Sequence, residues 1–160
     1  MEIIFKPIGT IYSPFNETTG MPIQPSAAIG IHGCIIMNDE FIEGIKDLDG
    51  FSHIILIYYL HLIEHSQLLV NPFMDSVERG IFSTRAPARP NPIGLSVVRL
   101  IDIQDNNLII ENVDIVNGTP LLDIKPYVPE CENYDDDYRI GWLTGNIYKL
   151  KNMKSDERFK

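Results

Sequence analysis

The sequence has only two cysteines, Cys34 and Cys131, and they lie far apart. The N-terminus lacks the basic start and long apolar core of a signal peptide, so two reduced thiols in the cytoplasm are expected, not a disulfide. The longest apolar run, Ile54–Leu60, is too short to cross a bilayer. These absences argue against a disulfide-stapled or membrane-spanning protein and predict a cytoplasmic one.

Several signatures of common enzymes are also missing. There is no G-x-G-x-x-G after a first strand, no phosphate-binding G-x-x-x-x-G-K-[ST] and no G-x-S-x-G. His61 and His65 have the spacing of two metal ligands on a helix, but the residues before them favour a strand. No Cys or Asp cluster completes a zinc site. We therefore expect neither a Rossmann-type site nor a bound metal.

Basic residues are scarce: 13 Lys and Arg stand against 22 Asp and Glu, for a formal net charge of −9. This argues against indiscriminate binding of nucleic acid. The charge is nevertheless uneven, since Arg79–Leu100 holds four arginines and no acid, whereas Glu130–Asp137 holds five acids and no base. A phosphate-bearing partner would have to meet the arginine segment. The alternative is that both segments are solvated surface.

What the sequence does contain is a series of short β-rich runs separated by Gly, Pro and Asn. Strands are expected at residues 8–12, 28–37, 51–61, 97–103, 108–115 and 121–127, with a further one possible at 142–150. Apolar spacing predicts a helix over 39–48, and Gln104–Asn107 predicts a hairpin turn with Asn in the left-handed conformation. The pattern predicts a mainly β fold: one domain, residues 1–160, forming a largely antiparallel barrel with one or two short helices. Its core would span about residues 5–150, followed by a basic tail at 151–160.

Three segments are more specific than a generic barrel requires. They are the Arg- and Pro-rich run Gly80–Ser96, the run Asp114–Pro129, and Gly50–His53 leading into Tyr58–His61. Together they resemble the TsaA-like family over about residues 8–129. Its characterised members are S-adenosylmethionine-dependent tRNA methyltransferases that act on N6 of threonylcarbamoyl-adenosine at position 37, next to the anticodon. The resemblance implies a barrel, S-adenosyl-L-methionine as methyl donor, the tRNA anticodon loop as partner, and a homodimer.

The resemblance also implies a donor site. Its residues would be Gln24, Pro25, Ser26, Leu60, His61, Arg85, Leu95, Glu111, Asn112, Val113 and Asp114. Arg85 suits a bidentate grip on a carboxylate, and Asp114 suits hydrogen bonds from ribose hydroxyls or an ammonium group. Ordinary structural roles remain open: core leucines, a strand-capping histidine, a loop arginine and a turn-capping aspartate.

The sequence points less specifically to the residues that would contact tRNA than to those of the donor site. Arg89 and Asn91 are candidates for contact with RNA, while Asp123, Lys125 and Tyr127 are candidates for catalysis. Lysine suits phosphate and tyrosine can stack on an unpaired base. Asp123 is the candidate proton acceptor, with a pair between Asp123 and Lys125 or an arginine as the structural alternative.

Two departures from the family pattern bear on the substrate. Asn117 stands where Asp is common, although Asn permits the same turn. The chain ends at Lys160, whereas many bacterial members carry a further C-terminal domain, so a tRNA contact made by that domain would here be absent or replaced. Two alternatives follow: methyl transfer to another RNA or to a small molecule, or a non-enzymatic nucleotide-binding barrel.

Overall fold

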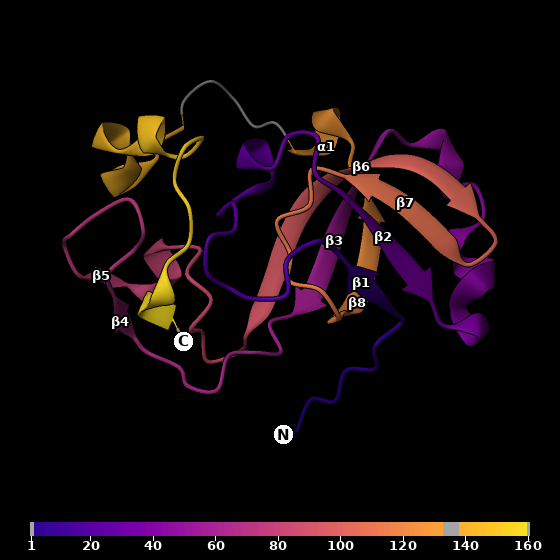
Figure 1. The fold of residues 1–160 in the computed structure, drawn as a ribbon, viewed down its shortest axis with the longest axis horizontal. Helices are drawn as coiled ribbons and strands as arrows, with labels where there is room; N and C mark the ends of the chain where they lie inside the picture. The colour runs from indigo at the N-terminus through magenta and orange to yellow at the C-terminus, as the bar shows by residue number, and fades with distance from the viewer. Residues whose placement is uncertain (1, 133–137, 160) are drawn as a thin grey trace.

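A closed barrel of six strands forms the centre of the computed structural model, which describes residues 2–132 and 138–159. The strands follow each other around the barrel in the order β1-β2-β7-β6-β3-β8, and each neighbouring pair is antiparallel. They are β1 (Gly9–Tyr12), β2 (His32–Met37), β3 (His53–Tyr59), β6 (Ile93–Gln104), β7 (Asn107–Glu111) and β8 (Thr119–Pro126). Figure 1 shows these strands on one side of the molecule. The predicted fold class is confirmed.

Apolar side chains at alternate positions along the strands fill the interior of the barrel. In β3, Ile54, Leu56 and Tyr58 are buried and belong to the main apolar cluster. Each of the other five strands also contributes side chains to this cluster: Ile11, Ile35, Met37, Val98, Leu100, Leu108, Ile110 and Leu121. Because alternate residues of a strand point to opposite faces, this pattern fixes which side chains point inward.

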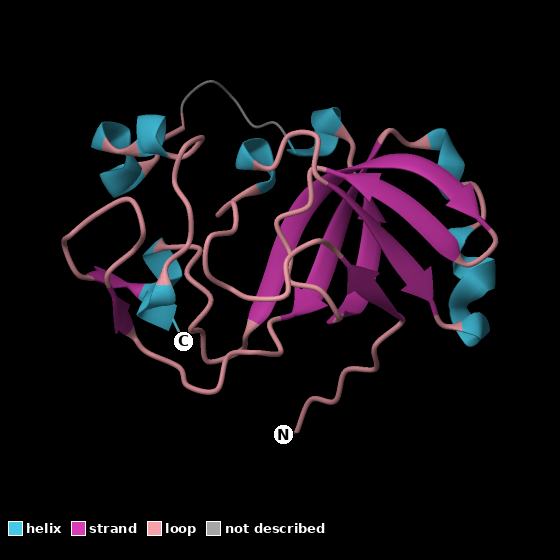
Figure 2. Ribbon diagram, viewed as in Figure 1, coloured by secondary structure: helices cyan, strands magenta, loops and turns pink. Residues whose placement is uncertain are grey.

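The segment between β3 and β6 and the C-terminal segment (residues 138–159) lie together beside the barrel, as Figures 1 and 2 show. The first contains the two-stranded sheet of β4 (Leu69–Val70) and β5 (Arg79–Gly80). Phe159 packs against a small buried cluster of Val70, Ile81 and Ala86. The two segments therefore share a second, smaller core.

Most helical structure in the described residues is 3-10. One short α-helix, α1 (Pro129–Glu132), is present together with η1 (Pro25–Ala27), η2 (Asp39–Ile45), η3 (Leu48–Gly50), η4 (Ile81–Ser83), η5 (Gly141–Gly145), η6 (Ile147–Lys149) and η7 (Glu157–Phe159). The expected helix over 39–48 is thus two 3-10 segments, interrupted by Asp47 in the left-handed region (φ 63°).

The possible strand at 142–150 is wrong, since η5 and η6 occupy that stretch. A closed barrel offers no free edge for another strand, and Gly145 and Asn146 break the apolar alternation. The expected hairpin is present between β6 and β7. However, Asp105 (φ 55°), and no asparagine of that turn, takes the left-handed conformation.

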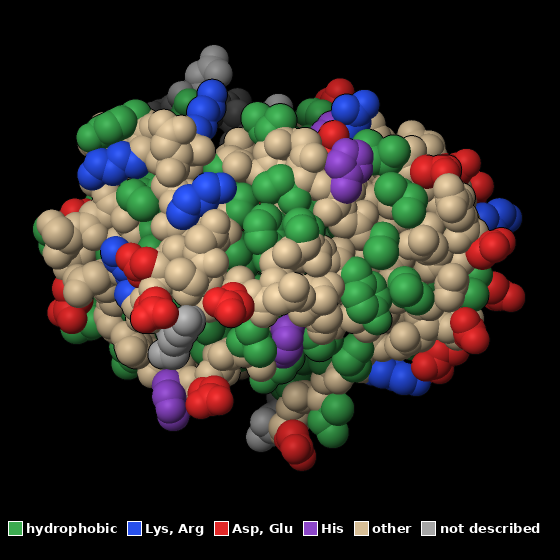
Figure 3. All heavy atoms as spheres, viewed as in Figure 1, with side chains coloured by type: hydrophobic (Ala, Val, Ile, Leu, Met, Phe, Trp, Pro, Cys, Tyr) green, Lys and Arg blue, Asp and Glu red, His purple; other side chains and the backbone are tan. Residues whose placement is uncertain are grey.

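Acidic side chains gather at one end of the barrel. Figure 3 shows these acidic side chains along the right-hand edge of the molecule, over η2, η3 and the β6–β7 hairpin. The exposed acids there are Asp39, Glu40, Glu43, Asp47, Asp49, Asp102 and Asp105. Of the acidic run predicted at Glu130–Asp137, Glu130 and Glu132 lie in α1, while residues 133–137 fall outside the described residues.

Both cysteines are free thiols, Cys34 partly buried and Cys131 exposed. No helix in residues 2–132 or 138–159 is long and apolar enough to cross a membrane.

Candidate functional site

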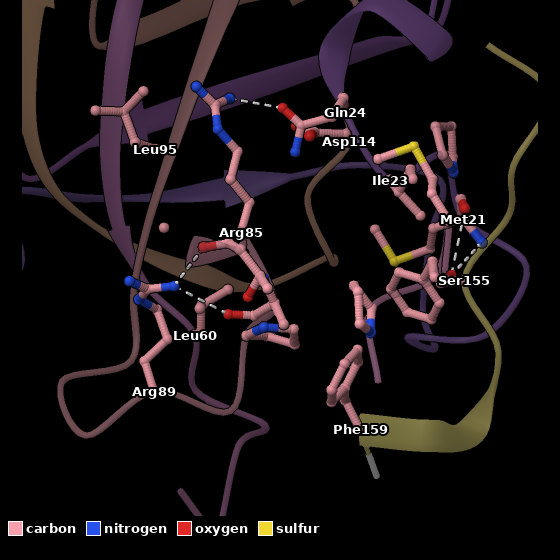
Figure 4. Close-up of a pocket in the computed structure, with 18 of the residues that line it drawn as sticks. Met21, Ile23, Gln24, Leu60, Arg85, Arg89, Leu95, Asp114, Ser155 and Phe159 are labelled. Carbon is pink, nitrogen blue, oxygen red and sulfur yellow. Dashed lines mark hydrogen bonds between the residues drawn. The ribbon is translucent and has the colours of Figure 1, made fainter. Parts of the chain in front are cut away.

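A cavity of about 850 Å³ lies between the barrel and the segments beside it. The barrel contributes the end of β3 and the start of β6. The remaining wall comes from residues 18–24, 60–63 and 72–89, from Asp114 and from the C-terminal segment. Figure 4 shows side chains from these separate stretches turned toward a common space. Cavities of this size lie within the range that small-molecule sites occupy.

Arg85 and Gln24 join two of the loops at this cavity. The Arg85 Nη1 group donates a 2.7 Å hydrogen bond to Gln24 Oε1. The turn that carries Arg85 is fixed locally, because the Thr84 hydroxyl donates to Ile81 O and accepts from the Ala86 N–H. One guanidinium nitrogen is thereby occupied, and the planar fork keeps further donors for a carboxylate.

Asp114 supplies a carboxylate to the same cavity. It follows β7 and a left-handed residue, Asn112 (φ 68°). The Ser96 hydroxyl donates a 2.7 Å hydrogen bond to Asp114 Oδ1, and Tyr58 Oη lies 3.0 Å from Ser96 Oγ. Burial raises the pKa of Asp114 to about 6, although the Ser96 hydrogen bond and the Arg85 charge act in the opposite direction.

Tyr58 is 6% exposed and forms part of both the core and the cavity wall. Burial, and then the charge of Asp114, raise the pKa of its phenol. Its ring packs directly over Gly94, where an added Cβ would lie 2.1 Å from Tyr58 Cε2. Gly94 is therefore the residue that lets the tyrosine reach Ser96 from inside the barrel.

The rest of the wall is largely apolar. Its side chains include Met21, Ile23, Leu60, Phe73, Met74, Leu95, Trp142, Leu143, Ile147, Leu150 and Phe159. Such a wall with few polar groups at fixed points is typical of a site for an organic ligand.

Five of the predicted donor-site residues converge on this cavity: Gln24, Leu60, Arg85, Leu95 and Asp114. The others do not line it. Pro25 and Ser26 lie in η1, and His61 Nδ1 lies 3.4 Å from Thr119 Oγ1. Glu111 forms a 3.6 Å ion pair with Arg99, and its other carboxylate oxygen lies 3.6 Å from His32 Nε2. Asn112 accepts a hydrogen bond from the Gly30 N–H, and the Val113 side chain is fully buried.

Arg89 also lines the cavity, but its guanidinium is engaged within its own loop. Its Nη1 group lies 3.0 Å from Thr84 O, 3.3 Å from Ile81 O and 3.4 Å from Ala86 O. Arg89 therefore braces the turn that carries Arg85. Asn91 is exposed and does not line the cavity.

The predicted catalytic residues lie elsewhere. Asp123 and Lys125, both on β8, form a 2.8 Å ion pair with each other, which is the structural alternative considered for Asp123. The ring of Tyr127 packs edge-to-face against His53 at 6.3 Å between centroids. None of the three lines the cavity, so the structure does not bring them together with the five donor-site residues.

Sequence reasoning missed the contribution of the C-terminal segment. The indole N–H of Trp142 donates to Ser83 O at 2.8 Å, and Ser155 Oγ accepts from the Met21 N–H at 2.9 Å. The Arg79 guanidinium stacks over Trp142 and pairs with Asp75 at 2.7 Å. The sequence's single tryptophan, next to a glycine, was the available signal.

Comparison with known proteins decides the family. The model of the tRNA-methyltransferase O N-terminal domain matches residues 10–133. The chain belongs to the tRNA-methyltransferase O family. This confirms the resemblance identified from Gly80–Ser96 and Asp114–Pro129. The C-terminal segment that lines the cavity lies entirely beyond the matched residues.

Relatives within the tRNA-methyltransferase O family differ in length. A probable S-adenosyl-L-methionine-binding protein of Pyrococcus abyssi is 54% identical over 157 residues, which cover 98% of this chain and 85% of that protein. The tRNA (adenine(37)-N6)-methyltransferase of Homo sapiens is 32% identical over 140 residues, 82% of this chain and 31% of that protein. The crystal structure of TrmO from Pseudomonas aeruginosa superposes with a TM-score of 0.73 at 35% identity, covering 89% of this chain and 63% of that one.

Within the described parts of the chain, no group of three or more His, Cys, Asp or Glu side chains is arranged to hold a metal ion. His61 and His65 are both outside the cavity wall.

Proposed function

We propose that this protein is an S-adenosylmethionine-dependent methyltransferase that acts on N6 of threonylcarbamoyl-adenosine at position 37 of tRNA. Membership of the tRNA-methyltransferase O family supports the reaction class. The observation that carries the proposal is the convergence of Gln24, Arg85 and Asp114 on one cavity, because their residue types complement the methyl donor.

The side chains present fit S-adenosylmethionine. The donor carries a carboxylate, an ammonium group, ribose hydroxyls and an apolar adenine face. Arg85, held by Gln24, suits the carboxylate, and Asp114 suits a ribose hydroxyl, a neutral partner that leaves the Asp114 carboxylate able to take up a proton. Leu60 and Leu95 offer apolar surface to the adenine. When bound, the donor supplies an electrophilic methyl group on its sulfonium.

The protein's own task is to bind and align. N6 of threonylcarbamoyl-adenosine belongs to a urea, so its lone pair is delocalised and its N–H is more acidic than that of a simple amine. Holding this nitrogen in line with the methyl carbon in a largely apolar cavity removes much of the entropic cost of a two-substrate reaction. A nearby carboxylate assists by taking the proton.

The tRNA contacts belong to the proposal as well. The chain spans 63% of the solved TrmO and 31% of the human relative, so whole-protein activities do not transfer directly. Asn91 is exposed near the cavity, and Lys151 and Lys154 are exposed in the C-terminal segment. The acidic cluster at the other end of the barrel lies away from the cavity, while exposed acids such as Glu78 and Asp156 lie on the cavity side. A homodimer and a cytoplasmic location remain part of the same proposal.

One alternative has specific support. Archaeal relatives, including the Pyrococcus abyssi protein and one of Archaeoglobus fulgidus that is 37% identical over 130 residues, are named S-adenosyl-L-methionine-binding proteins. A protein that binds the donor without transferring methyl to tRNA would match those names. Transfer of the methyl group to another RNA or to a small molecule is a further alternative, in which the protein is an enzyme with a different substrate.

Calorimetry followed by label transfer tests the proposal. EDTA-treated protein is titrated with S-adenosylmethionine, with adenosine as the ligand control, and then incubated with methyl-tritiated donor and tRNA. We expect donor binding in the micromolar range and label in tRNA. Absence of binding at millimolar donor would refute the enzyme, and binding without transfer to any tRNA would favour the binding protein.

A further inference from the structure

Few groups at the cavity can exchange a proton. Among the described residues that line it, those with ionisable side chains are Tyr58, Arg85, Arg89, Asp114 and Asp156. The arginines stay protonated in proteins. Burial raises the pKa of the Tyr58 phenol, which keeps that hydroxyl protonated near neutral pH.

Asp156 is a poor proton acceptor. Arg158 donates to its carboxylate from Nε at 2.8 and 3.0 Å and from Nη2 at 2.6 Å. These hydrogen bonds lower the pKa of Asp156. Asp114, by contrast, has no ion pair within 4 Å among the described residues and sits where burial makes a carboxylate more basic.

We propose that Asp114, and not Asp123, accepts the proton that leaves the methylated nitrogen, and that Ser96 and Tyr58 are positioning residues for it. This inference rests on the proposed methyl transfer and assigns its proton acceptor. Asp123 is 45% exposed, ion-paired with Lys125 and outside the cavity wall, so it lacks both the location and the environment for the role.

The hydroxyl chain has a defined direction. The single Ser96 hydroxyl proton points to Asp114 Oδ1 at 2.7 Å, so the Ser96 oxygen is left to accept from Tyr58 at 3.0 Å. Ser96 and Tyr58 are 1% and 6% exposed, so water does not compete for these bonds. The chain fixes one carboxylate oxygen, while protonation at the other oxygen leaves both hydrogen bonds intact.

The reaction step balances with this assignment. The nitrogen forms a bond to the methyl carbon, the S–CH₃ bond breaks with its electron pair left on sulfur, and the N–H proton passes to an Asp114 oxygen. Asp114 then loses the proton to solvent before the next turnover. The step needs no oxidant or reductant.

The groups that face Asp114 set the pH range of this step. Arg85 faces it from the loop after η4 and favours the carboxylate, and Ser96 from β6 does the same by hydrogen bonding. Tyr58, from β3, is neutral and so adds no charge beside Asp114. The burial of Asp114 outweighs the effects of Ser96 and Arg85, and the pKa of Asp114 is raised to about 6. The reactive form is the carboxylate, so the rate is expected to rise as pH increases through this value.

Titration of the protein without donor gives a first test independent of activity. Carbon-13 NMR of the Asp side-chain carboxyl groups, assigned with Asp114→Asn, is expected to show one Asp titrating near pH 6. Ser96→Ala should move that titration to higher pH, because a hydrogen bond to the charged form is lost. Titration of Asp114 at an ordinary aspartate pKa, unchanged in Ser96→Ala, would overturn the inference.

Single-turnover methylation from pH 5 to 9, at saturating donor and tRNA, gives the second test. Asp114→Asn is expected to lower the rate constant by roughly 10²–10⁴-fold and to remove the rise near pH 6. Ser96→Ala and Tyr58→Phe should retain that rise but shift it upward in pH. Asp102→Asn, an exposed aspartate at the far end of the barrel, is the matched control and should leave the profile unchanged.

Several outcomes would contradict the assignment. Recovery of the wild-type rate by Asp114→Asn once donor is saturating would make Asp114 a donor ligand only. If the methylation rate of Asp123→Asn no longer rose near pH 6, while that of Asp114→Asn still did, Asp123 would be the proton acceptor. If wild-type protein transfers no methyl to tRNA, the proposed function itself fails, which the wild-type assay shows before any variant is made.

Discussion

The Arg85 guanidinium donates a 2.7 Å hydrogen bond to the side-chain oxygen of Gln24, 61 positions earlier in the chain. This bond connects the loop before η1 with the loop after η4 at the wall of the cavity. It holds a cation beside the Asp114 carboxylate and leaves other guanidinium donors for a ligand. The pair therefore brings two segments that are distant in the sequence into one site.

Arg85→Ala is expected to weaken S-adenosylmethionine binding by about 1.5–3 kcal/mol, because a charge-assisted contact to the donor is lost. Gln24→Ala should weaken it less, since Arg85 keeps its charge. Trp142, the single tryptophan, lines the same cavity, so its fluorescence can follow donor titration. Lys46→Ala, at the barrel end away from the cavity, is the charge control. Unchanged affinity in Arg85→Ala would remove Arg85 from the donor site.

Arg89→Ala is expected to act through the loop that Arg89 braces. The variant loses hydrogen bonds to carbonyls of Ile81, Thr84 and Ala86, so the Arg85 turn loosens and donor affinity falls together with thermal stability. A direct RNA contact predicts a different result: unchanged donor affinity, a higher KM for tRNA and a weaker salt dependence. Calorimetry and methylation at two salt concentrations separate these outcomes.

Gly94→Ala is expected to destabilise the protein by about 1–3 kcal/mol, because its Cβ would lie 2.1 Å from a Tyr58 ring atom, which must then move. Displacement of Tyr58 should also disturb Ser96 and lower the methylation rate. Gly44→Ala, where no atom lies within 4 Å of the added Cβ, is the control. Denaturant unfolding that gives equal stabilities for the two variants would refute the packing argument.

The barrel was predictable from the sequence because alternation of apolar residues, as in β3, is local information. The convergence of Gln24, Arg85 and Asp114 could be predicted only through the resemblance to the family, because local sequence patterns do not show which loops meet in space. The Tyr58–Ser96–Asp114 chain depends on Gly94, whose lack of a side chain matters only once β3 and β6 are paired. The Trp142 and Ser155 contacts depend on packing between distant segments, which the sequence does not show. The possible strand at 142–150 was wrong for the same reason.

Asp114→Asn is expected to stabilise the donor-free protein at neutral pH. The pKa of Asp114 is raised from 3.8 to about 6 in the folded state, so above pH 6 its charge destabilises the fold, by up to about 3 kcal/mol. As pH falls from 6 toward 4, the folded protein binds this proton before the unfolded chain does. The advantage of the Asn variant should therefore shrink over that range.

Urea unfolding of Asp114→Asn and wild type at pH 7.5 and pH 4.5 measures this difference directly. Comparing the two proteins at each pH cancels the loss of other ion pairs, such as those of Asp75 and Asp156, in acid. A pH-independent difference would show that Asp114 ionises normally in the folded protein.

Mass spectrometry of anticodon-loop fragments, taken after incubation with S-adenosylmethionine, tests whether the protein methylates threonylcarbamoyl-adenosine at position 37. Two tRNA preparations are compared, one carrying threonylcarbamoyl-adenosine at position 37 and one with unmodified adenosine there. We expect a mass gain of one methyl group, localised to the modified nucleoside, only in the first preparation. A methyl group at any other position, equal methylation of both preparations, or none in either would contradict it.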